Sequence, residues 1–223
     1  MNETIDLRLR IKCEQDLPLD GDYMEEDMIE VFTGAIVARD RELDTETEVG
    51  WGTFYIVRLD VAINVGINGF EACDAMSQDL LEYASAVLDP ATGNIREDIL
   101  EEFECPPFDL LVLHMLEVLP AFRGWNIGLL AAQQVIEYYA KGLVLLRPQP
   151  LQFLDPMERR EYYDQMEYSR FITPREPARQ KLRDHWAQLG FKPIDDGEFL
   201  ALDATLRRDK VHLRRVGPVG STA

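Results

Sequence analysis

The spacing of apolar and polar positions predicts that the first third of the chain is built mainly of strands. From residue 4 to residue 12 the odd positions are apolar and the even positions are polar, the period of two that indicates a half-exposed strand. Val31–Ala38 predicts a second strand and, after a polar turn at residues 42–48, Val49–Ile63 predicts a long third strand. Residues 20–30 carry six acidic side chains and no basic one, which favours a loop or a short helix.

The middle of the chain changes to a helical period and then to an apolar run. Between Met76 and Val87 apolar side chains recur at spacings of three and four, which predicts a helix. Turn-forming residues at 89–94 end this helix, and Ile95–Phe103 predicts a short acidic helix after it. Asp109–Leu119 carries apolar side chains on both faces, as a central strand covered on both sides does.

The second half alternates helices with short strands. Ile127–Lys141 predicts a helix with Asn126 as its N-cap and Gly142 as its stop. Further expectations are a buried strand at Leu143–Leu146, a charged, tyrosine-rich surface helix within residues 149–173, an amphipathic helix at Arg175–Leu189, and a closing hairpin at Phe191–Ile194 and Glu198–Asp203.

Composition narrows the classes of protein. The 223 residues suit one large domain or two small ones. A net charge of −18 disfavours nucleic acid and anionic membranes and favours cationic partners, although an acidic surface also serves solubility alone. The most apolar stretch, residues 110–119, is too short to span a bilayer.

The cysteines and the start of the chain predict a cytoplasmic protein. Cys13, Cys73 and Cys105 lie far apart and without metal-ligand spacing, so we expect no metal site and a reducing compartment. The first residues show no basic segment leading into an apolar run, so no secretion signal is expected.

The densest chemical signal follows the apolar strand. Pro120 ends that strand, and a short turn with Gly124 and Gly128 leads into the helix at Ile127. Backbone N–H groups converge at a helix N-terminus, where the helix dipole favours an anion. Arg123 adds a positive charge suited to phosphate. The segment therefore predicts an anion site.

These residues resemble a known family. Arg123-Gly124-Trp125-Asn126-Ile127-Gly128 is similar to the R/Q-x-x-G-x-G/A pyrophosphate loop of the GNAT acyl-CoA-dependent N-acyltransferases, and Val118-Leu119-Pro120-Ala121-Phe122 resembles its lead-in. Farther on, residues 184–191 (DHWAQLGF) resemble that family's helix ending in K-L-G-F. The two matches occur in the family's order and cover roughly residues 109–203, with residues 151–173 as an insertion.

The resemblance implies a fold and a ligand. The fold is α/β of the mixed α+β kind: a central twisted mixed β-sheet flanked by helices on both faces. One domain would span residues 1–206, with an atypical half at 1–108 and an acyl-CoA-binding core at 109–206, followed by a basic tail at 207–223 that we expect to be partly disordered.

The resemblance also assigns binding roles. The backbone around Val118 would pair with the pantetheine arm of acetyl-CoA. The pyrophosphate would lie in the loop formed by Arg123, Gly124, Trp125, Asn126, Ile127 and Gly128. The acceptor amine would enter from the other side of a splayed pair of strands.

The chain departs from the family at two positions. Asn126 replaces the central glycine of the loop; asparagine tolerates left-handed backbone, but its side chain narrows the approach of a phosphate. Trp186 stands where the family often has a tyrosine acid, and an indole cannot protonate a thiolate.

Two side chains are candidate general bases. His114 lies on the central strand and can titrate near neutral pH, although a hydrogen-bonded core histidine is the alternative. Glu117 should point to the opposite face unless a bulge shifts the register. A chain of water molecules is a third option. Tyr162, Tyr163 and Tyr168 of the insertion form either an acceptor wall or part of a solvated helix.

The sequence therefore supports two functions from different classes. The first is transfer of an acetyl group from acetyl-CoA to a cationic small-molecule or peptide amine by direct attack in a ternary complex. The second is an inactive GNAT-like module that binds CoA or a protein, and the acidic segments at 20–30 and 97–104 would suit a basic protein. A second copy of the chain, in a homodimer, is a further hypothesis for a partner.

Overall fold

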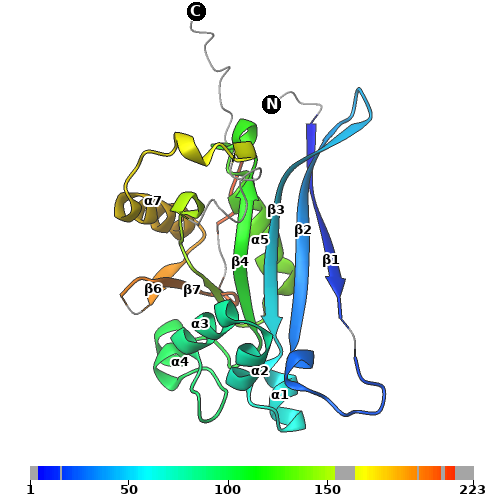
Figure 1. Ribbon diagram of the computed structural model, residues 1–223, viewed down its shortest axis with the longest axis vertical. Helices are drawn as coiled ribbons and strands as arrows, with labels where there is room; N and C mark the ends of the chain where they lie inside the picture. The colour runs from blue at the N-terminus through cyan, green and yellow to red at the C-terminus, as the bar shows by residue number, and fades with distance from the viewer. Residues whose placement is uncertain (1–4, 16, 154–163, 195, 207–208, 214–223) are drawn as a thin grey trace, which may run out of the picture.

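One mixed β-sheet runs through the chain. The computed structural model describes residues 5–15, 17–153, 164–194, 196–206 and 209–213. Within these residues seven strands form a single sheet in the order β1-β2-β3-β4-β5-β7-β6, accompanied by six α-helices (Figure 1). The expected mixed α/β architecture is confirmed.

The first three strands form an antiparallel meander. β1 (Ile5–Glu14), β2 (Ile29–Asp40) and β3 (Thr45–Val57) pair in chain order, and the short 3-10 helix η1 (Glu25–Met28) precedes β2. The predicted half-exposed strand at residues 4–12 is therefore confirmed, and the structure places it at the outer edge of the sheet.

The remaining strands include the only parallel pair in the described sheet. β4 (Leu110–Val118) runs antiparallel to β3 and parallel to β5 (Leu143–Leu146). β7 (Phe199–Asp203) then pairs antiparallel with β5 and with β6 (Lys192–Ile194). The expected strands at 109–119 and 143–146 and the closing hairpin are confirmed.

The long third strand was predicted wrongly at its end. β3 stops at Val57, and the following residues form helix α1 (Leu59–Val65). Strand alternation would place Ile63 on the same face as Leu59, but Leu59 is buried and Ile63 is 57% exposed. The change occurs at Arg58, whose N–H donates to the Met28 carbonyl and whose side chain turns to acidic partners, as described below.

The helical region at the centre is two helices where one was predicted. α2 (Gly69–Met76) was not expected, and α3 (Gln78–Val87) begins after Ser77, whose hydroxyl caps it by accepting the Leu80 N–H at 3.2 Å. α4 (Glu97–Phe103) starts two residues later than expected, because Ile95 forms a β-bridge with Leu88.

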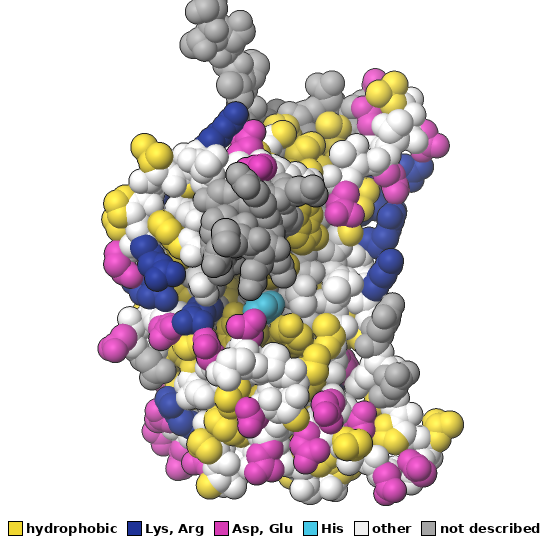
Figure 2. Space-filling view, in the orientation of Figure 1, with side chains coloured by type: hydrophobic (Ala, Val, Ile, Leu, Met, Phe, Trp, Pro, Cys, Tyr) yellow, Lys and Arg dark blue, Asp and Glu magenta, His cyan; other side chains and the backbone are white. Residues whose placement is uncertain are grey.

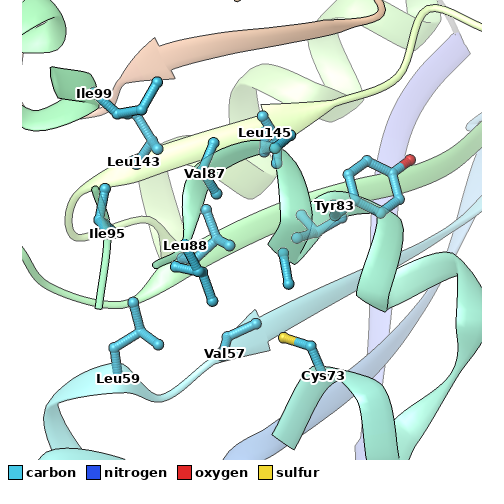
Figure 3. Close-up of a cluster of buried hydrophobic side chains, with 14 of the residues drawn as sticks. Val57, Leu59, Cys73, Tyr83, Val87, Leu88, Ile95, Ile99, Leu143 and Leu145 are labelled. Atoms are coloured by element: carbon cyan, nitrogen blue, oxygen red, sulfur yellow. The ribbon is translucent and has the colours of Figure 1, made fainter. Parts of the chain in front are cut away.

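The sheet is covered on both faces. α1 to α4 pack together at one end of one face, where α3 and α4 meet alternate residues of the central strands (Figure 3). This core includes Val57, Leu59, Cys73, Tyr83, Val87, Leu88, Ile95, Ile99, Leu143 and Leu145. α5 (Ile127–Tyr139) covers the opposite face, where Leu129 and Ile136 pack with Leu111 and Val144.

The surface charge is unevenly distributed. Acidic side chains gather over the end formed by α1 to α4, whereas basic side chains lie along the outer strands and on the opposite side of the molecule, in the region of α7 (Figure 2). Arg8 and Arg10 of β1 pair with Asp6 and Glu46, so much of this basic row is neutralised locally.

The structure describes only parts of the insertion and of the tail. The structure described around the insertion consists of the 3-10 turns η3 (Leu151–Phe153) and η4 (Tyr168–Arg170) and of two helical residues at 164–165. Residues 154–163, with Tyr162 and Tyr163, lie outside the described residues, so the surface helix expected within residues 149–173 stays a prediction there. Within the tail, the Val211 N–H donates to Gln133 Oε1 at 3.0 Å, so this part packs on α5. Residues 207–208 and 214–223 lie outside the described ones.

α7 (Arg175–Ala187) confirms the predicted amphipathic helix. None of the helices in the described part of the chain has both the length and the apolar character that a membrane crossing requires.

Candidate functional site

The site is a cavity between two strands that separate. β5 pairs with β4 only along Leu111–Leu113, and β4 then continues to Val118 without it. A cavity of about 680 Å³ lies beyond the last pair. Its walls come from β4, the loop before α5, the segments flanking residues 154–163, and α7.

One wall of the cavity is an open strand edge. The carbonyls of Met115 and Glu117 approach Gly52 and Gly50 of β3. Because peptide groups alternate along a strand, those of Leu116 and Val118 face away from β3, toward the cavity. An extended ligand could therefore add to this edge as a further strand would.

The loop before α5 forms the end of the cavity. After η2 (Pro120–Phe122) the backbone is left-handed at Gly124 (φ 81°) and again at Asn126 (φ 63°). The first bond of α5 runs from the Leu130 N–H to the Asn126 carbonyl, so the N–H groups of the preceding turn have no partner within the helix. Ile127 and Gly128 line the cavity and bring this turn to it.

Asn126 adopts the conformation that its glycine-like position requires. Its side chain does not cap α5; its Nδ2 donates instead to the His212 carbonyl at 3.3 Å. The asparagine amide is therefore held by the C-terminal segment.

Gly128 stands where a Cβ would fit without a clash. A Cβ at this position would meet only Val118 and Leu116 methyl groups, at 3.7 and 3.9 Å, which is ordinary contact distance. The backbone conformation does not demand glycine either, because the φ of Gly128 is not positive. A glycine here keeps the cavity wall free of a side chain.

Arg123 is bonded to the protein in this structure. Its Nε donates to the Val118 carbonyl at 2.9 Å and its Nη2 to the Met166 carbonyl at 3.0 Å. The guanidinium also lies 5.7 Å from the ring centre of Tyr168 and 5.1 Å from that of Phe171. Arg123 thus ties the end of β4 to residues 166–171.

The other loop residues divide into two groups. The cavity is lined by most of them, namely Val118, Arg123, Gly124, Asn126, Ile127 and Gly128. Trp125 does not line it: its side chain packs beside Phe122 on the core formed by Ile36 and Val49.

A β-bulge brings the two candidate bases to one face. Thr53 pairs with Met115 and Phe54 with Leu113, so His114 is an extra residue in β4. Without the extra residue, positions three apart would face opposite sides of the sheet. With it, His114 and Glu117 lie on the same face, and both line the cavity. The sequence analysis expected Glu117 on the opposite face unless a bulge shifted the register, and the structure contains that bulge.

Glu117 is a buried carboxylate that accepts hydrogen bonds from an indole and a phenol. Its Oε2 accepts the Trp51 indole N–H at 3.0 Å, and its Oε1 accepts the Tyr168 hydroxyl. The side chain is only 4% exposed. Hydrogen bonds from neutral donors stabilise the charged form of a carboxylate that burial would otherwise penalise.

His114 lies among aromatic rings beside one acid. The ring centres of Tyr55 and Tyr83 lie 5.5 and 6.0 Å from the centre of the imidazole ring, and the His114 Nε2 is 3.8 Å from Asp79 Oδ2. Burial lowers the pKa of His114 below its usual range, and Asp79 opposes this only in part. A neutral imidazole at pH 7 can accept a proton.

α7 closes the remaining wall. Trp186 packs edge-on against Phe191 and, with His185 and Lys181, borders the cavity. Among the described residues that line the cavity, Tyr168 is the one tyrosine.

The sequence did not reveal the role of Trp51, and it left two roles open for Tyr168, an acceptor wall or part of a solvated helix. Tyr168 belongs to a charged segment that suggested a solvated helix, but it is only 8% exposed. The pairing of Trp51 with Glu117 could not be predicted because it depends on the register between β3 and β4. The bulge in β4 then decides which face of the sheet the two side chains share.

Comparisons with protein-family models, with curated proteins and with solved structures gave no significant match. Within the described residues no three His, Cys, Asp or Glu side chains form a group that could hold a metal ion.

Proposed function

We propose that this protein is a GNAT-type N-acetyltransferase that transfers an acetyl group from acetyl-CoA to an amine. The observation that carries the proposal is the cavity between the separating strands β4 and β5. It joins an open strand edge and a helix N-terminus on one side to a buried carboxylate and a histidine on the other. The resemblance of residues 118–128 to a pyrophosphate loop supports the same assignment.

The cofactor would occupy the open edge and the loop. Pantetheine carries amide groups that can pair with the peptide groups of Leu116 and Val118. The pyrophosphate would sit at the start of α5, where unpaired N–H groups and the helix dipole favour negative charge. Since Arg123 bonds to the Val118 carbonyl, pairing there would use the Val118 N–H or require Arg123 to move.

The acceptor would approach from the face that carries His114 and Glu117. The amine must lose a proton to attack the thioester carbon, and Glu117 or His114 can accept it. Backbone N–H groups at the edge of β4 would stabilise the developing oxyanion. Holding both substrates in one cavity turns a bimolecular encounter into a positioned attack.

The buried carboxylate favours a cationic acceptor. An ammonium group that reaches Glu117 gains a charge-assisted hydrogen bond in a site shielded from water. We place the reaction in a reducing cytoplasm, which suits the free thiols of Cys13, Cys73 and Cys105.

The second candidate is a module that binds CoA without catalysis. The Trp186 indole and the protein-bonded state of Arg123 favour this alternative. Such a module would use the same cavity but would release no thiol.

Two measurements test the proposal. Isothermal titration with acetyl-CoA should give saturable binding, and release of free thiol should then be followed across a panel of a polyamine, a lysine peptide and an aminoglycoside. Thiol release above background with at least one amine supports the enzyme. Binding without any release supports the module, and no binding of acetyl-CoA overturns both.

A further inference from the structure

We propose that Tyr168, from the segment inserted before α7, supplies the proton that the departing thiolate needs. The inference rests on the proposed acetyltransferase function. It fills the gap left by Trp186, which borders the cavity but has no hydroxyl to give.

The position of Tyr168 suits this role. Its hydroxyl donates to Glu117, the residue between the two open-edge peptide groups of β4 at Leu116 and Val118. A thioester paired with that edge would therefore lie beside Glu117, and the phenol on Glu117 would lie beside the thioester. The ring is 8% exposed and lines the cavity, so its hydroxyl is shielded from bulk water.

The surroundings of Tyr168 keep its proton in place until Glu117 loses its charge, because Glu117 is one of the groups that raise the pKa of the phenol. Burial and the neighbouring Glu117 raise the pKa of Tyr168 above its usual range, so the phenol is protonated at neutral pH. The Arg123 guanidinium, 5.7 Å from the ring centre, opposes this shift and would stabilise a transient phenolate. Arg123 also fixes the ring by bonding to the Met166 carbonyl.

The proton balance of the transfer closes within three groups. The acceptor first loses its ammonium proton, which His114 can take and pass to water. The neutral amine nitrogen then attacks the thioester carbon, the C–N bond forms, and the C–S bond breaks to give a thiolate. The thiolate sulfur takes the Tyr168 proton, and Glu117 takes the surplus proton from the amine nitrogen. Glu117 then returns that proton to the Tyr168 phenolate, so both side chains end as they began.

The test compares Tyr168→Phe with wild type, using acetyl-CoA and the fastest amine of the panel. We expect kcat to fall by about 10²-fold or more, as for loss of a general acid, while the Kd of acetyl-CoA stays within about twofold. Tyr138→Phe is the control, because Tyr138 is 83% exposed and outside the cavity lining.

A second variant separates chemistry from packing. Replacing Tyr168 by 3,5-difluorotyrosine keeps the ring and the hydroxyl but lowers the pKa of the phenol. Since the proposal requires a protonated phenol, kcat of this variant should fall at a lower pH than kcat of wild type. If Tyr168→Phe does not fold, the fluorinated variant alone decides.

The outcomes distinguish the two proposals. Wild-type turnover with an unchanged kcat in Tyr168→Phe, or an unshifted pH profile in the fluorinated variant, overturns the role of Tyr168 and leaves the acetyltransferase intact. Bound acetyl-CoA without turnover in wild type overturns the acetyltransferase, and the role of Tyr168 with it.

Discussion

At the scale of single residues, Gly128 is a glycine that the fold does not require but that a bound ligand would. Its position has room for a Cβ, and its φ is not positive. The protein alone therefore gives no reason for a glycine in the first turn of α5. A ligand that lies against the backbone at this point does give one.

We expect Gly128→Ala to stabilise the protein and weaken its cofactor binding. Alanine in a helix is favoured over glycine by about 0.5–1 kcal/mol, so urea unfolding should show a more stable variant. The new methyl group should raise the Kd of acetyl-CoA roughly tenfold. Gln134→Ala, on the exposed side of α5, is the control for affinity. Unchanged affinity in Gly128→Ala would place the phosphates elsewhere.

His114 should make stability depend on pH. Because its pKa is lower in the folded protein than in the unfolded chain, the unfolded chain binds more protons as the pH falls below about 6.5. Folding stability should therefore be lost between the unfolded and the folded pKa, and be unaffected by this group above both. His114→Gln should show a smaller loss between pH 7.5 and pH 5 in urea unfolding. An equal loss in both proteins would show that the imidazole is not desolvated.

At the scale of elements, one corner fixes where β3 ends and α1 begins. Arg58 bonds to Glu30 at 2.6 Å and to Asp109 at 2.5 Å, and Lys141 lies 3.2 Å from the same Asp109. Asp109 is only 2% exposed. The starts of β2, β4 and α1 are therefore linked through one guanidinium.

Removing that guanidinium should be costly. Arg58→Ala leaves a buried carboxylate at Asp109 with one exposed lysine partner, and breaking a buried pair from one side costs about 3 kcal/mol or more. Arg8→Ala removes a pair with Asp6 whose arginine is exposed, and should cost far less, because water and salt screen an exposed pair. Chemical denaturation of both variants measures the difference. Similar losses would mean that the corner does not hold the elements together.

The same corner explains which elements the sequence could predict. Strands such as β1 and β4 were found because their apolar spacing and their burial agree. Residues 59–63 were taken as strand because Leu59, Val61 and Ile63 also fit a period of two, and nothing local shows that Arg58 turns the chain. The loop at residues 123–128 was found from its glycines, but the bulge at His114 depends on pairing with β3, and the burial of Tyr168 depends on Arg123.

At the scale of the whole molecule, net charge opposes the proposed cofactor. The chain carries −18, and acetyl-CoA is also strongly anionic. Long-range repulsion should slow their encounter at low ionic strength, since charges are screened only beyond about 10 Å at 0.1 M salt. Arg123 and Lys181 lie at the cavity, so attraction begins only at close range.

Salt should therefore speed the association of acetyl-CoA. Raising salt from about 20 to about 200 mM should increase the association rate by a few fold, as followed by stopped-flow tryptophan fluorescence. Acetyl-CoA dissociation should change much less, which serves as the internal control. Slower association at higher salt would mean that the positive groups of the cavity govern the encounter.

The separation of β4 from β5 has a consequence for solvent exchange. Amide hydrogens of Met115 and Glu117 point into the sheet, whereas those of Leu116 and Val118 point to the open edge. Amide hydrogens along β4 should therefore exchange for deuterium at alternating rates, quickly at Leu116 and Val118 and slowly at Met115 and Glu117. A ligand lying along this edge would erase the alternation, and so would report its own position residue by residue.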